Sequence, residues 1–166
     1  MKRLTVVVLG MLLAAPVMAE EVDRTLDAAS DGRVHISNIA GAVTIDGWSR
    51  DQVQVTGELG RNVEELIFER DGDKVTIKVK VPKKSGRGIE SDLYIQVPQA
   101  SSIDVSTVSA DIDVRKVSGE QSLGTVSGDI DTESAESDIS AEAVSGDIEV
   151  IGQDKVTNTR ANTVSG

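Results

Sequence analysis

The sequence predicts an all-β protein in which a stack of short strands, a β-solenoid or β-roll, follows antiparallel hairpins. Three observations predict this fold. After residues 1–19 are set aside, the chain holds 19 Val and 13 Ile against 5 Leu, and β-branched side chains favour strands. Apolar and polar residues alternate, which is the period of a strand. From residue 101 onward the sequence repeats itself, as stacked repeat architectures do.

Residues 1–19 have the composition of a secretory signal peptide. Two basic residues precede an apolar run, Leu4–Val17, and small residues stand at 17 and 19, where signal peptidase requires them. The alternative is an uncleaved anchor, but this run is shorter than the roughly 20 residues that span a bilayer. We therefore expect cleavage before Glu20 and export to the periplasm, the outer membrane or the cell surface, with no later transmembrane segment.

The charge and cysteine content exclude several classes of protein. The 166 residues include 17 Lys and Arg, 28 Asp and Glu, one His and no Cys, for a net charge of −11. Without Cys there is no disulfide, no thiolate chemistry and no lipid attached at a cysteine. The negative charge works against nucleic acid and against direct binding to anionic lipid, because both need clustered cations.

The predicted N-terminal region, residues 20–100, consists of strands and hairpins. Asp71-Gly72-Asp73 separates two apolar-patterned runs, a typical hairpin signal. Pro98 ends the last run, because proline lacks the donor that a ladder needs. The runs with alternating apolar residues are 34–39, 43–45, 53–55, 66–70, 74–81 and 93–97.

The predicted repeat region, residues 101–166, contains copies of a Val-Ser-Gly-Asp-Ile motif. The best copies begin at Val108, Val126 and Val144, degenerate copies lie halfway between them, and a last copy starts at Val164 after a two-residue insertion. The period is thus eighteen, with a finer step of nine. One full period makes a coil with two sheets back to back, although an antiparallel meander also fits. Alternation predicts that Val108, Ala110, Ile112 and Val114 point inward. The full copies are 108–114, 126–132 and 144–150, and the degenerate ones are 117–123 and 135–141.

In a solenoid, equivalent acidic residues form columns at the strand spacing of about 4.8 Å. One predicted column is Asp111, Asp129 and Asp147, a second is Asp113, Asp131 and Glu149, and Glu120 and Asp138 lie on the opposite sheet. Repulsion within such columns favours cations, and oxygen ligands suit Ca²⁺. Calcium-binding rolls, however, place Gly-Gly and Asp in turns, whereas these acids are expected in mid-strand. A solvated face that keeps the sheet soluble is therefore the main interpretation, and a Ca²⁺ ladder is the alternative.

Three features outside the repeat are candidate sites. The basic loop 82–88 resembles an anion clamp, but it lacks the strand-to-helix context of a phosphate cradle, which favours a solvated loop. His35 has no visible partner and is expected to be exposed. Trp48 could anchor a ligand, but it is expected to cover one end of a core that is poor in aromatic residues.

The segment 38–55, followed by Val-Ser-Gly-Asp-Ile copies behind a signal peptide, resembles the bacterial β-strand-repeat family called "putative adhesins". The resemblance spans most of residues 30–166. It implies a secreted or envelope-associated β-solenoid-like domain and carries no assigned catalytic residue. No polar cap is recognisable after Val150, so we expect either a fragment truncated at its C-terminus or a sheet that another chain completes.

These observations predict a non-catalytic protein without a cofactor. No nucleophile elbow, P-loop or His and Cys metal cluster is present. The leading hypothesis is an adhesin-like surface or envelope module that binds an extracellular polymer or a protein. The alternatives are a periplasmic structural or regulatory module that pairs sheet edges, including those of its own copies, and a calcium-binding β-roll.

Overall fold

The computed structural model describes residues 19–84, 86–135, 137–153 and 158–165 of the chain. Within these residues the chain forms twelve strands and no helix, so no described helix could cross a membrane. The predicted signal segment lies almost entirely outside the described residues. The strands are β1 (Glu20–Asp27), β2 (Arg33–Trp48), β3 (Gln52–Leu59), β4 (Glu65–Asp71), β5 (Lys74–Lys80), β6 (Glu90–Pro98), β7 (Ser102–Arg115), β8 (Gln121–Ser127), β9 (Ile130–Ala135), β10 (Ile139–Ser145), β11 (Ile148–Gln153) and β12 (Thr159–Ser165).

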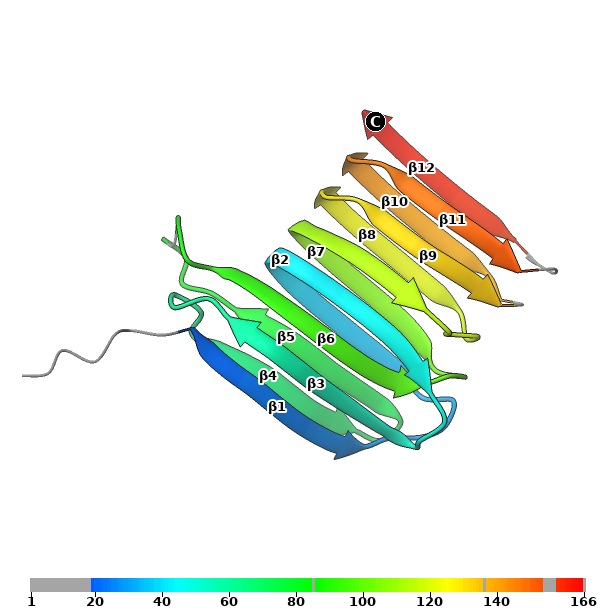
Figure 1. Cartoon of the computed structure of the whole chain (residues 1–166), viewed down its shortest axis with the longest axis horizontal. Helices are drawn as coiled ribbons and strands as arrows, with labels where there is room; N and C mark the ends of the chain where they lie inside the picture. The colour runs from blue at the N-terminus through cyan, green and yellow to red at the C-terminus, as the bar shows by residue number, and fades with distance from the viewer. Residues whose placement is uncertain (1–18, 85, 136, 154–157, 166) are drawn as a thin grey trace, which may run out of the picture.

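The strands form two sheets that lie back to back (Figure 1). Sheet A has the order β4-β5-β2-β7-β8-β10-β12, and sheet B has the order β1-β3-β6-β2-β7-β9-β11. The long strands β2 and β7 belong to both sheets, because each bends at its middle and continues on the other side. The first half of each pairs in sheet A and the second half in sheet B.

The repeat region is a parallel β-solenoid, as the sequence predicts. Ile103 pairs with Gln121, and Gln121 pairs with Ile139, so one coil takes one full period of the repeat. Ile139 then pairs with Thr159, which places the two-residue insertion in the last coil. All these pairings are parallel. The antiparallel meander is therefore excluded here.

The N-terminal strands extend this solenoid. Strand β2 pairs in parallel with β7 from Arg33 to Asp46, so it is itself a coil, and β5 with β6 forms another coil on its far side. The predicted regions 20–100 and 101–166 thus share both sheets. Antiparallel strands then close this end: β4 pairs with β5, β3 with β6, and β1 with β3. The hairpin predicted around Asp71-Gly72-Asp73 is the β4–β5 connection.

The core between the sheets is thin and aliphatic. The inward residues of each coil stack on those of the next, as Val43, Ile112 and Ile130 do, and each of these is at most 1% exposed. Burying one such side chain stabilises the fold by about 1.5–3 kcal/mol. Phe68 is only partly buried against this core. Gln121 is fully buried in the same column as Ile103 and Ile139.

The bend between the two sheets corrects one sequence prediction. Val108 was expected to point inward, but it is 45% exposed. Thr107 is buried instead, and its hydroxyl donates a hydrogen bond to the carbonyl of Ala110 at 3.1 Å. Two consecutive residues, Val108 and Ser109, point outward as β7 bends, so the alternation shifts by one position. Strict alternation cannot continue through a corner.

Candidate functional site

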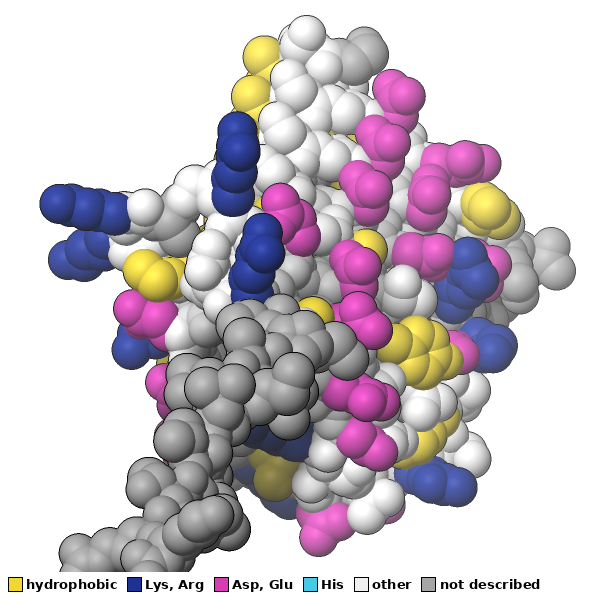
Figure 2. Space-filling model, turned by 60° about the vertical axis from the view of Figure 1, so that its left-hand side comes forward, with side chains coloured by type: hydrophobic (Ala, Val, Ile, Leu, Met, Phe, Trp, Pro, Cys, Tyr) yellow, Lys and Arg dark blue, Asp and Glu magenta, His cyan; other side chains and the backbone are white. Residues whose placement is uncertain are grey.

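The predicted acidic columns run from coil to coil across the outer side of sheet B. Asp131 pairs in register with Asp113 on one side and with Glu149 on the other, so the second predicted column exists. Asp111, Asp129 and Asp147 follow the bends of three successive coils and are all exposed. Figure 2 shows Asp and Glu side chains gathered in rows over the upper right of that view. Glu120 and Asp138 stand directly before strands β8 and β10 of sheet A.

The first column forms a ladder of hydrogen bonds between coils. The backbone N–H of Asp129 donates to Asp111 Oδ1 at 3.0 Å, and the N–H of Asp147 donates to Asp129 Oδ1 at 2.9 Å. The prediction of mid-strand acids was wrong for two of these residues. Asp129 lies between β8 and β9, and Asp147 lies between β10 and β11. The carboxylates of Asp111 and Asp129, which accept these hydrogen bonds, therefore stabilise the bends.

This geometry offers little to a cation. In residues 19–165, apart from the undescribed positions, no three His, Asp or Glu side chains form a group that could hold a metal ion. On a flat sheet, neighbouring side chains stand roughly parallel rather than converging on one point. One oxygen of Asp111 and one of Asp129 are already engaged by backbone N–H groups. The Ca²⁺ ladder stays a prediction.

Tyr94 stands in the middle of the outer side of sheet B. It is 40% exposed, and its hydroxyl donates a hydrogen bond to Asp46 Oδ2 at 3.2 Å. Lys116 Nζ lies 3.3 Å from Asp46 Oδ1. Burial raises the pKa of Tyr94 above its ordinary value, and the hydrogen bond to Asp46 and its negative charge raise it further, while Lys116 and Arg115 act in the opposite direction. Arg115 pairs with Asp113 at 2.6 Å. The charges around this aromatic ring are thus locally balanced.

Trp48 lies near one end of sheet B. Its indole Nε1 donates to the carbonyl of Gln52 at 2.7 Å, and the guanidinium of Arg50 lies 5.0 Å from the ring centroid. The ring therefore closes the β2–β3 turn. It is not among the partly buried side chains that pack on the main core, which makes the predicted cover over the core end wrong.

His35 has a partner that the sequence did not reveal. His35 Nδ1 lies 3.1 Å from Asp104 Oδ2 on the neighbouring strand, and both side chains are partly exposed on the outer side of sheet A. The two residues are 69 positions apart, so only the pairing of β2 with β7 could have indicated the contact. Thr76 stands opposite His35 on its other side, in β5. The pair is open to solvent and lies in no enclosed cavity that could exclude water.

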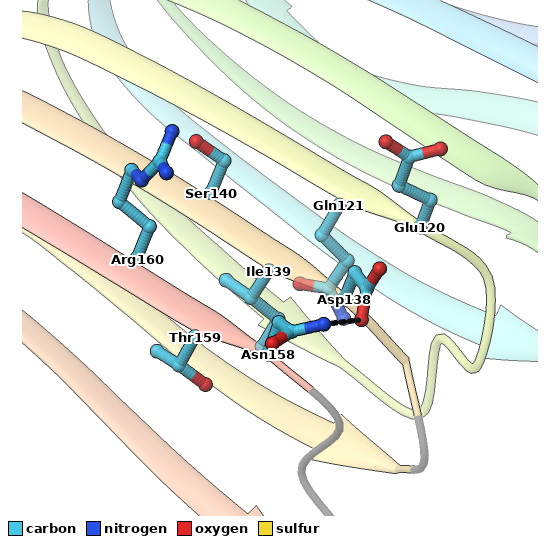
Figure 3. A pocket seen from close by; sticks show the side chains of 8 residues that line it. All are labelled: Glu120, Gln121, Asp138, Ile139, Ser140, Asn158, Thr159 and Arg160. Carbon is cyan, nitrogen blue, oxygen red and sulfur yellow. Dashed lines mark hydrogen bonds between the residues drawn. The ribbon is translucent and has the colours of Figure 1, made fainter.

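A hollow lies where β8, β10 and β12 begin (Figure 3). One contact between its side chains is a hydrogen bond from Asn158 Nδ2 to Asp138 Oδ1 at 3.4 Å. Ser140 and Arg160 stand side by side in register on neighbouring strands. The lining is mixed polar and charged, and the hollow is open to solvent. It is formed by Glu120, Gln121, Asp138, Ile139, Ser140, Asn158, Thr159 and Arg160.

Exposed valines stack at the bends of the coils, and we call them the valine ridge. The ridge consists of Val108, Val126, Val144 and Val164, each at least 45% exposed. A shallow groove beside it is lined by valine together with Thr107, Thr125 and Glu142. The ridge arises because the alternation of inward and outward residues shifts at each bend, which turns Val108 and its equivalents outward. It is narrow, with one apolar side chain per coil.

Residues 28–166 match the model of the Toastrack DUF4097 family. The chain belongs to this family. The match includes every strand except β1, so the resemblance to an adhesin-like β-repeat family of unknown function is confirmed. No curated protein matches the chain.

Several solved bacterial structures resemble this Toastrack chain distantly. One is a "putative cell adhesion protein" of Clostridium sporogenes, with 12% identity, a TM-score of 0.49, and coverage of 87% of this chain and 100% of that one. Another is a "putative adhesin" of Bacteroides fragilis, with 12% identity, a TM-score of 0.36, and coverage of 87% and 93%. A third is a "Putative lipid binding protein" of Parabacteroides distasonis, with 10% identity, a TM-score of 0.32, and coverage of 88% and 95%.

Proposed function

We propose that this Toastrack chain is a non-catalytic, exported binding module of the cell envelope or surface. Its outer sheet B would contact an extended polymer or a protein. The observation that carries the proposal is the continuous polar row that crosses sheet B in register. Along this row lie Asp23, Thr56, Tyr94, Thr44, Asp113, Asp131 and Glu149.

The shape of this surface supports an extended partner. Hydroxyl and carboxylate groups recur along this row at the strand spacing of about 4.8 Å, and Tyr94 supplies an exposed aromatic ring among them. Aromatic side chains and Arg are the residues that most often dominate binding interfaces. The hollows found among the described residues are open to solvent. Catalysis of polar chemistry generally needs a site that excludes water.

Location is the first test of this proposal. A protease-cleavable tag in the Asp71–Asp73 turn would be exposed, because Gly72 has no neighbour within 4 Å of its Cβ position. Cells are digested intact and after the outer membrane is permeabilised. Cleavage in intact cells is expected for a surface module, and cleavage only after permeabilisation would favour the periplasmic module. Resistance in both preparations, with release only on lysis of the inner membrane, would overturn export.

The second test asks whether sheet B is covered in cells. Because the sequence contains no Cys, single cysteines can be placed at Thr44 on the outer side of sheet B and at Thr76 on the outer side of sheet A, as a matched pair of partly exposed strand positions. We expect a maleimide to label T44C more slowly in cells than in the purified protein, and T76C equally in both. Equal labelling of T44C in cells and in solution would contradict the proposal.

A further inference from the structure

A basic tip projects from the N-terminal end of the solenoid. Two connections build it: residues 60–64, between β3 and β4, and the described residues 81–84 and 86–89, between β5 and β6. Strands β5 and β6 pair with β2 on either side of Asn38 and Ile39, where β2 bends. The second connection therefore stands at the position of a bend and replaces the tight bend that other coils have at this edge. The longer loop extends beyond the neighbouring bends, at the upper left of the sheets in Figure 1.

The tip carries four cations, which are Arg61, Lys83, Lys84 and Arg87. All four are exposed, and none forms an ion pair in the part of the chain that the structure describes. The acid in the shorter loop, Glu64, is paired with Lys80 at 3.7 Å. In a protein of net charge −11, four unpaired cations are thus gathered at one tip, with the exposed acids Glu65 and Glu90 at its margins. At physiological ionic strength, charges farther away than about 8 Å are largely screened, so these cations act locally.

Backbone contacts hold the two halves of the tip together. The N–H of Asn62 donates to the carbonyl of Gly88 at 2.8 Å, and the Asn62 side-chain amide donates to the carbonyl of Arg87. The Arg61 side chain lies over Gly88, whose φ of +72° suits glycine. Cations from two loops are therefore brought together before any partner binds. Partly buried Val63, Pro82 and Ile89 add apolar surface among them.

The N-terminus of the folded part also lies beside this tip. Glu20, the first residue of β1, pairs with Leu59, which is two residues before Arg61. The apolar segment Leu4–Val17 precedes Glu20 in the sequence, with Lys2 and Arg3 before it. Export directs such a segment into the membrane. Until cleavage before Glu20, the basic tip is thus adjacent to the point where the folded part is joined to a membrane-directed segment.

We propose that the basic tip binds an anionic phospholipid surface. Charge complementarity supports this partner, since clustered Lys and Arg bind anionic lipid with roughly a fivefold gain in partitioning for each cation near the surface. The partly exposed apolar residues of the tip, Val63, Pro82 and Ile89, favour a membrane over other polyanions, because such side chains suit the interface between headgroups and acyl chains. Sheet B stays free for the partner of the proposed function. This inference goes beyond that function, because it assigns a second surface and a second ligand.

Vesicle sedimentation tests the proposal. The full chain, as processed and recovered from expressing cells, is mixed at low salt with vesicles of phosphatidylcholine alone and with vesicles that also contain phosphatidylglycerol. The ratio of the two partition coefficients isolates the electrostatic contribution, whether or not the signal segment is retained. We expect phosphatidylglycerol to raise partitioning and added salt to abolish the rise. For K83Q/K84Q we expect a loss of about 25-fold in this ratio.

The matched control is K74Q/K78Q, which removes the same charge from two exposed lysines on the outer side of β5. Its partition ratio should stay within a factor of about three of the wild type. Equal losses in the two variants would overturn the proposal, because net charge alone would explain binding. Equally strong, tip-dependent binding of a single-stranded oligonucleotide would also overturn it. All these variants change exposed side chains, and unchanged melting temperatures will show that they fold.

Discussion

The carboxylate of Asp111 accepts a hydrogen bond from the backbone N–H of Asp129, 3.0 Å away, and so ties one coil of the solenoid to the next. The same contact recurs one coil later between Asp129 and Asp147. The Asp of the repeat therefore has a structural role at the bend, and its recurrence in each coil follows from the need to satisfy one N–H there. An acidic column can arise without any ligand selecting it.

Replacing Asp111 separates hydrogen bonding from charge. Asp111→Ala removes the acceptor and should cost about 1 kcal/mol of unfolding free energy. Asp111→Asn keeps an Oδ1 acceptor and should cost much less, because it also relieves repulsion in the column. Urea unfolding measures both. Asp131→Ala is the control, since no described hydrogen bond involves that side chain and it is exposed. An equal loss in the Asn and Ala variants would contradict the structural role.

Salt should stabilise the protein without selectivity for calcium. Two unit charges at the strand spacing of about 4.8 Å repel by roughly 0.9 kcal/mol even in water. Screening by sodium chloride should therefore raise the melting temperature. At matched ionic strength, Ca²⁺ and Mg²⁺ should have equal effects, and EDTA should have none, because no described group of acids converges as a metal site. A stabilisation specific to Ca²⁺ would restore the calcium-roll hypothesis.

Gly128 should tolerate substitution poorly. Its φ is +153°, and a Cβ there would lie 2.4 Å from the carbonyl oxygen of Ala110 in the coil below. Gly128→Ala should therefore cost about 1–3 kcal/mol or more. Gly124 is the matched control in the same coil, because its Cβ would lie 3.8 Å from the nearest neighbour, the Val105 carbonyl oxygen. Gly124→Ala should be neutral or slightly stabilising in the same denaturation assay.

The repeat made the solenoid predictable, whereas the bends and the partners of individual side chains could not be predicted. The constant period between copies such as 108–114 and 126–132 specifies equivalent strands. It does not show where the alternation shifts, which is why Val108 was assigned to the wrong side. Gly41 bends β2 without ending it, so two predicted strands are one. Contacts between distant residues, such as His35 with Asp104, depend on a pairing that local sequence does not encode.

The first strand was missed for a related reason. In β1 only Val22 is fully buried and Leu26 is partly buried, so the strand has almost no apolar alternation. It forms because its backbone pairs with β3 along its whole length, from Glu20 opposite Leu59 to Asp27 opposite Gln52. Hydrogen bonding at a sheet edge leaves little trace in side-chain pattern.

Gln121 should show strong coupling to Thr132. It is completely buried between Ile103 and Ile139 in the core column, its amide donates to the carbonyls of Val117 and Glu133, and its Oε1 accepts from the Thr132 hydroxyl. Gln121→Leu should destabilise the protein by about 1–3 kcal/mol, because it leaves buried polar groups without partners.

A double-mutant cycle tests this interpretation. Thr132→Val added to Gln121→Leu removes the stranded hydroxyl and should recover part of the loss, with a coupling energy of about 0.5 kcal/mol or more. Strictly additive effects of the two substitutions in urea unfolding would show that the hydrogen bond between them contributes nothing.

Tyr94 provides a direct optical measure of the sheet B surface. It is the single tyrosine of the sequence, so the ultraviolet absorbance of tyrosinate follows this residue alone. Burial, the hydrogen bond to Asp46 and the charge of Asp46 hold its pKa above the ordinary value of about 10. Asp46→Asn should move the titration to lower pH, though not fully to the ordinary value, because burial remains. Asp131→Asn, farther along the sheet, should leave the midpoint in place.

The same shift predicts how stability depends on pH. Because the folded pKa of Tyr94 is raised, the folded state binds the phenolic proton more tightly than the unfolded state does. This contribution is fully present below pH of about 10 and is lost as the pH rises through the folded pKa. Unfolding free energies measured across that range should fall more steeply for the wild type than for Tyr94→Phe. Parallel curves would mean that the folded state does not raise the pKa of Tyr94.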